Sequence, residues 1–138
     1  VTECRPGVYA YYDRVKVGFG VATQNDCAMK VITSVVSRPH STRAIIDSGS
    51  KTLTQDGFQW AEGFGHIIEY PDAKITNLSE EHGIIDLEGS KQNPSIAERL
   101  TIIPNYCNGV TNLHDVVYGF SGSKVEAIWP VAARGMVL

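Results

Sequence analysis

The feature that most limits the possible folds of this chain is its series of short apolar runs separated by turn residues. The runs recur about every 8–12 positions and leave little room for helix between them. Such spacing predicts an all-β chain, folded as a distorted β-barrel or sandwich with one or two short helices. The 138 residues contain no internal repeat, linker or low-complexity segment, so we expect residues 1–138 to form a single domain.

Alternation and turn residues place the individual strands. The clearest strand is expected at residues 27–36, ended by Arg38 and Pro39. An aromatic-rich strand at residues 7–12 should precede a short helix that Asp13 caps. A hairpin is predicted at 116–120 and 124–129, joined by a Ser-Gly-Ser turn. The other expected strands are residues 42–47, 63–70, 74–78, 83–87, 98–103 and 131–138.

Composition excludes several classes of protein. The net charge of -3, without a basic run, argues against nucleic acid and anionic membranes as partners. No apolar stretch is long enough to cross a bilayer, and the start shows no signal-peptide pattern. Three cysteines are too few for a disulfide framework and favour a reducing compartment, the cytoplasm. The chain begins at Val1, which processing or excision from a longer polypeptide would each explain.

Five motifs in order carry a resemblance to a known family. They are TECRPGVY at residues 2–9, AIIDSGSK at 44–51, LSEEHG at 78–83, NLHD at 112–115 and VEAIWPVAARG at 125–135. On these motifs, nearly the whole chain resembles the C-terminal β domain of the D-serine dehydratase and D-threonine aldolase family. The fold should then be similar to the C-terminal domain of fold-type III pyridoxal phosphate enzymes.

The resemblance implies a division of labour between two domains. In the family a (β/α)8 barrel precedes this domain and carries the lysine that forms a Schiff base with pyridoxal phosphate. The implied partners are therefore that barrel domain, a second subunit in a homodimeric full enzyme, and a small D-amino acid bound near the domain junction. No catalytic or cofactor-binding residue is assigned to this chain, which should be inactive alone. Lys51 is expected to be an exposed turn lysine and not the cofactor lysine.

The resemblance also raises the question of a metal site. Family members usually present His-x-Cys, or His-x-Asp in some aldolases, just after a Pro-Asn pair, and there bind a divalent ion that acts on the substrate hydroxyl. Alignment from Pro104 without gaps puts Tyr106 and Asn108 at those two positions. A phenol and a neutral amide are poor zinc ligands near neutral pH. On a strand Cys107 would face the opposite side, whereas a one-residue slip would put it at the cysteine position.

Two outcomes follow for the metal. A lost site is favoured, with Cys107 as a small half-buried residue and His114–Asp115 as a hydrogen-bonded turn pair. The alternative is a rebuilt zinc or manganese site in which Cys107 joins His82 or His114. For the run Ser79-Glu80-Glu81-His82 two interpretations stay open. It is either an active-site loop with His82 as acid, base or ligand, or a locally bonded turn.

Three functions are compatible with these patterns. The leading one is an accessory β domain of a pyridoxal phosphate-dependent D-amino-acid lyase, a D-serine dehydratase or D-threonine aldolase. The alternative is a non-catalytic binding or structural module of the same fold with an eroded metal site. A weaker third is a homodimeric aspartic protease built on the Asp47-Ser48-Gly49 run, although a turn explains those residues without chemistry.

Overall fold

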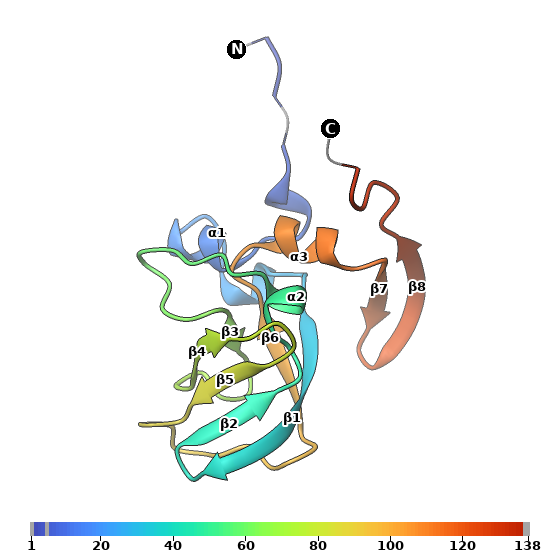
Figure 1. Cartoon of the computed structure of the whole chain (residues 1–138). Coiled ribbons are helices and arrows are strands. Elements are labelled where there is room, and N and C mark those ends of the chain that lie inside the picture. Colours follow the sequence, from blue (N-terminus) through green and yellow to red (C-terminus); the bar gives the residue numbers. More distant parts are fainter. Residues whose placement is uncertain (1, 5, 137–138) are drawn as a thin grey trace.

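The computed structural model describes residues 2–4 and 6–136. Six antiparallel strands form one sheet in the order β3-β6-β1-β2-β5-β4 (Figure 1). The two outer strands approach each other where Phe64 N donates to Ile75 O at 3.0 Å, so the sheet is a nearly closed barrel. The expected all-β class is confirmed. The strands are β1 Val31–His40, β2 Arg43–Ile46, β3 His66–Ile67, β4 Lys74–Leu78, β5 Gly83–Asp86 and β6 Arg99–Ile103.

The barrel interior follows from strand alternation. Val31, Thr33 and Val35 of β1 are buried while Ile32 between them is exposed, as the period of two requires. The centre of the core is aliphatic and fully shielded from solvent, with side chains from β2, β4, β5 and β6: Ile46, Ile75, Ile85, Leu100 and Ile102. Burial of such side chains is the main favourable contribution to folding.

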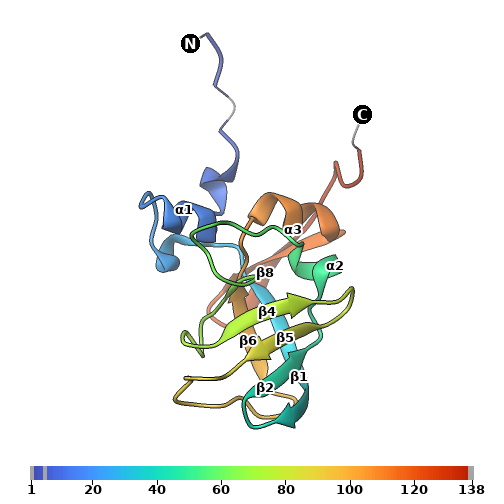
Figure 2. The same ribbon diagram turned by 60° about the vertical axis from the view of Figure 1, so that its left-hand side comes forward.

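Three short helices lie at one end of the barrel (Figures 1 and 2). They are α1 Arg14–Gly18, α2 Ser50–Leu53 and α3 Cys107–Leu113, and 3-10 turns are formed by Val8–Ala10 and Gln24–Asp26. Asp13 caps α1 as predicted, because its Oδ1 accepts a hydrogen bond from Lys16 N at 3.2 Å. Helix α3 was not expected: the predicted strand ended at residue 103, and the side-chain directions of residues 106–108 were argued as for a strand. None of the described helices is long and apolar enough to cross a membrane.

Four predicted strands have wrong bounds. The strand expected at residues 63–70 is reduced to the two-residue β3, His66–Ile67. Residues 7–12 form a turn and no strand, because Tyr11 N and Tyr12 N both donate back to Val8 O. Strand β1 begins at Val31 and not at residue 27, and it runs through Pro39 to His40. Its ladder with β6 ends at Ser34, and Val35 makes the last backbone bonds on that edge, with Ala97 and Glu98, so Pro39 interrupts no ladder there. Residues 131–136 make successive turns and no strand, whereas residues 137–138 of that prediction lie outside the described part.

The predicted hairpin is confirmed. β7 Val116–Ser121 pairs with β8 Lys124–Pro130 in a separate two-stranded sheet. It extends beside the barrel from the end of α3 (Figure 1).

Candidate functional site

The segment between β6 and α3 is held by a buried polar network. Asn105 Nδ2 donates to Asp56 O and to Gly63 O, each at 2.8 Å, and Asn105 Oδ1 accepts from Arg14 Nη1 at 2.8 Å. The buried Asp13 adds a second tie, since its Oδ2 accepts from the backbone N–H of Cys107 at 3.1 Å. One carboxylate therefore caps both α1 and α3, and it fixes where α3 begins.

The two positions that the resemblance assigns to metal ligands lie at the start of α3. Asn108 Nδ2 donates to Tyr106 OH at 3.1 Å, so the two side chains are in contact. They meet across a helix start and not on a strand as expected. An amide and a phenol bonded to each other in this way do not fit a zinc or manganese ion.

Asn108 also lines a surface pocket of about 270 Å³. The pocket joins the N-terminal segment, α3 and the tail after β8, and its lining residues are Gly7, Tyr11, Asn108, Thr111, Asn112, Val131 and Ala133. None of these side chains is charged at neutral pH, but amide and hydroxyl groups are present. The pocket is therefore suited to hydrogen-bonding a neutral polar group. Sequence reasoning missed Thr111 and Asn112, although their i+3 and i+4 spacing from Asn108 is a helical signal.

Cys107 is fully buried, and its Sγ donates to Asn108 Oδ1 at 3.6 Å. Burial, together with the nearby Asp13 carboxylate, raises the pKa of the Cys107 thiol to about 12. The thiol is therefore protonated at neutral pH and is a poor nucleophile.

The two candidate histidines lie elsewhere. His114 follows the other end of α3, where its Nδ1 is 2.8 Å from Val110 O. His82 is exposed in the loop between β4 and β5. Within residues 2–4 and 6–136, no group of three or more His, Cys, Asp or Glu residues could hold a metal ion. The structure thus does not bring Cys107, His82 and His114 together as one such cluster.

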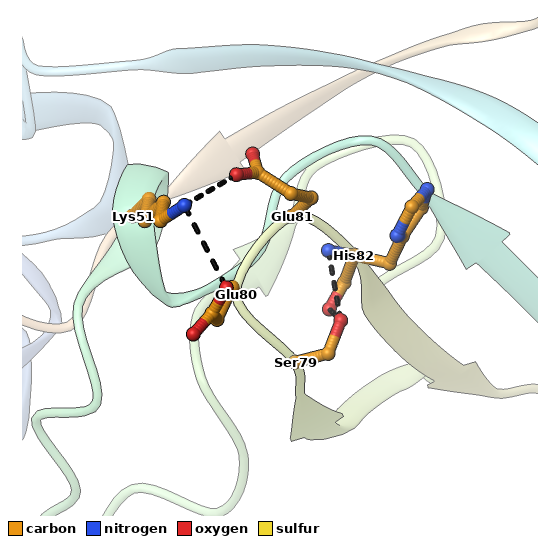
Figure 3. Close-up of polar contacts among 5 residues, drawn as sticks. All are labelled: Lys51, Ser79, Glu80, Glu81 and His82. Carbon is orange, nitrogen blue, oxygen red and sulfur yellow. Dashed lines mark hydrogen bonds and ion pairs between the residues drawn. The ribbon is translucent and has the colours of Figure 1, made fainter.

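The loop that contains His82 is a locally bonded turn docked on α2 (Figure 3). Ser79 N donates to His82 O at 2.8 Å and His82 N donates to Ser79 Oγ at 3.1 Å. The first residues of α2 hold the loop from the other side, since Ser50 N donates to Ser79 O at 2.8 Å. A glycine is needed at Gly49 because a Cβ there would overlap the backbone of Glu80.

Lys51 is exposed, as expected, and is paired with two carboxylates of this loop. Its Nζ lies 2.7 Å from Glu81 Oε1 and 3.6 Å from Glu80 Oε2 (Figure 3). The hydrogen bond and charge of Glu81, with the charge of Glu80, raise the pKa of Lys51. A cationic, solvent-exposed ammonium is unsuited to Schiff-base formation, which needs the free amine.

Asp47, the residue behind the protease hypothesis, has structural partners. Its Oδ1 accepts from Thr33 Oγ1 at 2.6 Å and from Ser34 N at 2.8 Å. The carboxylate thereby links β1 to the turn that follows β2.

Comparison with known proteins gives consistent matches. The sequence profile of the family described as "Putative serine dehydratase domain" matches residues 28–120. An uncharacterized protein of Mycobacterium tuberculosis is 36% identical over 127 residues, which is 89% of this chain and 96% of that protein. The 3-hydroxy-D-aspartate aldolase of Paracoccus denitrificans is 32% identical over 109 residues, 78% of this chain and 26% of the enzyme.

Solved structures agree with the sequence matches. The D-threonine aldolase from Filomicrobium marinum superposes with a TM-score of 0.79 at 29% identity, over 97% of this chain and 36% of the aldolase. The D-threo-3-hydroxyaspartate dehydratase of Delftia sp., at 22% identity and a TM-score of 0.78, shares the fold. The chain therefore spans nearly all of one mycobacterial relative but only about a third of these enzymes.

Proposed function

The chain belongs to the serine dehydratase domain family, and from this membership we propose that it is the accessory β domain of a pyridoxal phosphate-dependent D-amino-acid lyase. The observation that carries the proposal is the match to a D-threonine aldolase over 97% of the chain. Relatives are named for D-threonine, 3-hydroxy-D-aspartate and D-threo-3-hydroxyaspartate. All three compounds are D-amino acids with a hydroxyl on the β-carbon, and this is the substrate class we propose.

The proposed partner is a barrel domain that holds the cofactor. When bound there, pyridoxal phosphate supplies an electron sink at the substrate α-carbon. Lys51, the lysine considered for this role, is held by Glu81 in an exposed ion pair. The cysteines at positions 4, 27 and 107 are all free, which suits a cytoplasmic enzyme.

The role proposed for this chain is to bind and orient the substrate side chain. The pocket beside α3 presents amide and hydroxyl groups of Asn108, Thr111 and Asn112. Such groups hydrogen-bond a substrate hydroxyl and discriminate against analogues that lack it. Because Tyr106 and Asn108 do not fit a divalent ion, no metal-dependent step is assigned to them.

The isolated chain tests one half of the proposal. Purified alone, it should release neither ammonia and pyruvate from D-serine nor glycine from D-threonine above a heat-killed control. Turnover by the isolated chain would refute an accessory role.

A chimeric enzyme tests the other half. In the Arthrobacter D-threonine aldolase, 30% identical over 141 residues, the matching C-terminal part is replaced by this chain. We expect the chimera to release glycine from D-threonine faster than the aldolase truncated before the matching part. Asn108→Ala in the chimera should raise KM more than it lowers kcat, because it removes a binding group.

A second function is favoured by one specific observation. The Tyr106–Asn108 hydrogen bond suits a non-catalytic binding or structural module whose metal site has been lost. A folded chimera that is no more active than the truncated aldolase would favour this module over the lyase domain.

A further inference from the structure

The loop that joins α2 to β3 forms one wall of a second surface pocket. This loop runs past α1 (Figures 1 and 2). Its residues 57, 58 and 61–64, together with Lys74 and Thr76 of β4, line a pocket of about 510 Å³, which we call the loop pocket. The volume is within the range of small-molecule sites, about 300–1,000 Å³. None of these residues also lines the pocket beside α3, and the proposed function does not use them.

Hydrogen bonds to its backbone hold the loop in place. Arg14 Nη1 donates to Glu62 O at 3.1 Å, and Asn105 Nδ2 donates to Gly63 O at 2.8 Å. The two donor side chains are themselves joined, since Arg14 Nη1 also donates to Asn105 Oδ1 at 2.8 Å. The wall of the loop pocket is therefore pre-formed, and a ligand would not have to order it on binding.

The loop pocket combines aromatic rings with small residues. Phe58 and Phe64 are half-buried. The ring of Phe58 is continued by that of Trp60, whose centroid is 5.9 Å away and whose plane is tilted by 23°. Gly57 and Ala61 add little bulk to the lining. A flat apolar group suits these surroundings, because contacts between aromatic rings stabilise a complex beyond the area that they bury.

Two opposite charges also line the loop pocket. Lys74 Nζ and Glu62 Oε2 form an ion pair, and the two side chains are 55% and 77% exposed. Their hydrogen bond and mutual attraction lower the pKa of Glu62 and raise the pKa of Lys74, so both groups are charged at neutral pH. The contact uses one of two carboxylate oxygens and one of three ammonium protons, so each group has capacity for a further hydrogen bond.

We propose that the loop pocket binds an aromatic α-amino acid as its zwitterion, with the ring against Phe58 and Phe64, the ammonium on Glu62 and the carboxylate on Lys74. A zwitterion carries its two charges on groups joined by one carbon, so it can match the ion pair charge for charge. A ligand with a single charge meets a like charge as well as an opposite one, and it should bind less well. For a ligand of about 12 non-hydrogen atoms we expect a dissociation constant of roughly 0.3–3 mM.

A chemical-shift titration of the ¹⁵N-labelled chain with D-phenylalanine, and separately with L-phenylalanine, tests the site. Backbone amides of residues 57–64 and 74–76 should shift and saturate by about 20 mM, a span set by the expected dissociation constant. Alanine has the same charged groups without the ring and should leave these shifts unchanged. The proposal is overturned if neither enantiomer gives saturable shifts, if alanine gives the same shifts, or if the shifts lie elsewhere, such as in the pocket beside α3.

Two analogues that each lack one charge test the role of the ion pair. 3-Phenylpropanoate lacks the ammonium and phenethylamine lacks the carboxylate. Because contacts between exposed charges are weak, each analogue should bind the wild type only about two- to five-fold more weakly than phenylalanine. Glu62→Gln should remove the preference for phenylalanine over 3-phenylpropanoate, and Lys74→Gln should remove the preference over phenethylamine. A misfolded variant would instead bind all three compounds more weakly.

Glu81→Gln is the matched control for these variants. It alters the ion pair with Lys51, whose side chains are similarly exposed at 63% and 59%, and it should keep the wild-type order of affinities. Equal affinity of the wild type for all three compounds overturns the proposal. So do preferences that Glu62→Gln and Lys74→Gln leave unchanged, or that Glu81→Gln removes equally. The titrations measure binding to this chain alone, so their outcome is independent of the proposed lyase function.

Discussion

Replacement of Asp13 by alanine should destabilise the protein far more than loss of an ordinary surface carboxylate. The buried side chain accepts from Lys16 N at 3.2 Å and from Cys107 N at 3.1 Å, and it thus caps two helices. Loss of one cap costs about 1 kcal/mol, within a range of roughly 0.5–2. A buried N–H left without an acceptor costs about 1–3 kcal/mol. The variant no longer has to bury a carboxylate, and this gain offsets part of the two costs. We therefore expect the free energy of unfolding to fall by about 2–4 kcal/mol.

Such a loss is a large fraction of a typical unfolding free energy of about 5–15 kcal/mol. Urea unfolding followed by circular dichroism measures it directly. Asp26→Ala is the matched control, because Asp26 also accepts two hydrogen bonds, from Thr23 N at 2.8 Å and Thr23 Oγ1 at 2.7 Å, but is fully exposed. Its effect should be clearly smaller. If the two variants lose equal stability, the reasoning that one buried carboxylate organises both helices is wrong.

Three further predictions concern the cysteines and the positions of the family's metal ligands. In the native protein a thiol reagent should modify Cys4 quickly and Cys27 and Cys107 only on unfolding, because the last two are buried; rapid labelling of all three would contradict the structure. The pKa of the Cys107 thiol is about 12 in the folded protein and about 8.5 in the unfolded chain. The folded state therefore holds this proton more tightly, which contributes stability in full below about pH 8.5. That contribution is lost as pH rises from there toward the folded pKa. Cys107→Ala should therefore flatten the fall in unfolding free energy between about pH 8.5 and 11, and an unchanged slope would exclude this thiol as its source. Finally, Tyr106→His combined with Asn108→Cys should raise bound zinc several-fold over wild type by elemental analysis, because these side chains already meet at 3.1 Å; Thr111→His with Asn112→Cys serves as the control pair.

Local signals were enough to place most of the barrel. The bounds of β4, Lys74–Leu78, agree with the prediction because the run is enclosed by turn residues on both sides. The hairpin was equally clear from its Ser-Gly-Ser turn. In each case, residues within a few positions of one another determine the structure.

Helix α3 shows why the candidate site was harder to predict. Its first free N–H, on Cys107, is satisfied by Asp13, which lies 94 residues earlier in the chain. Sequence reasoning assigned the α1 cap of Asp13 correctly, since that bond is local. It had no means to detect the second cap, and so it placed Tyr106 and Asn108 on a strand. The expected proximity of these two side chains survived the error, because residues two apart also lie close together where a strand turns into a helix start.

The network around α3 bears on the choice between the two proposed functions. Burying the polar side chains of Asn105 and Asp13 costs free energy unless each of their polar atoms has a hydrogen-bond partner. Fully paired, such groups fix the position of the segments they join more than they add to stability. Here Asn105 is paired on both its oxygen and its nitrogen, and both Asp13 oxygens accept backbone N–H groups. A surface that only packs against a partner does not need its helix start fixed this closely. The precise placement of Tyr106 and Asn108 beside a polar pocket therefore favours a site that binds a ligand through hydrogen bonds, as the accessory lyase domain requires, over a purely structural module.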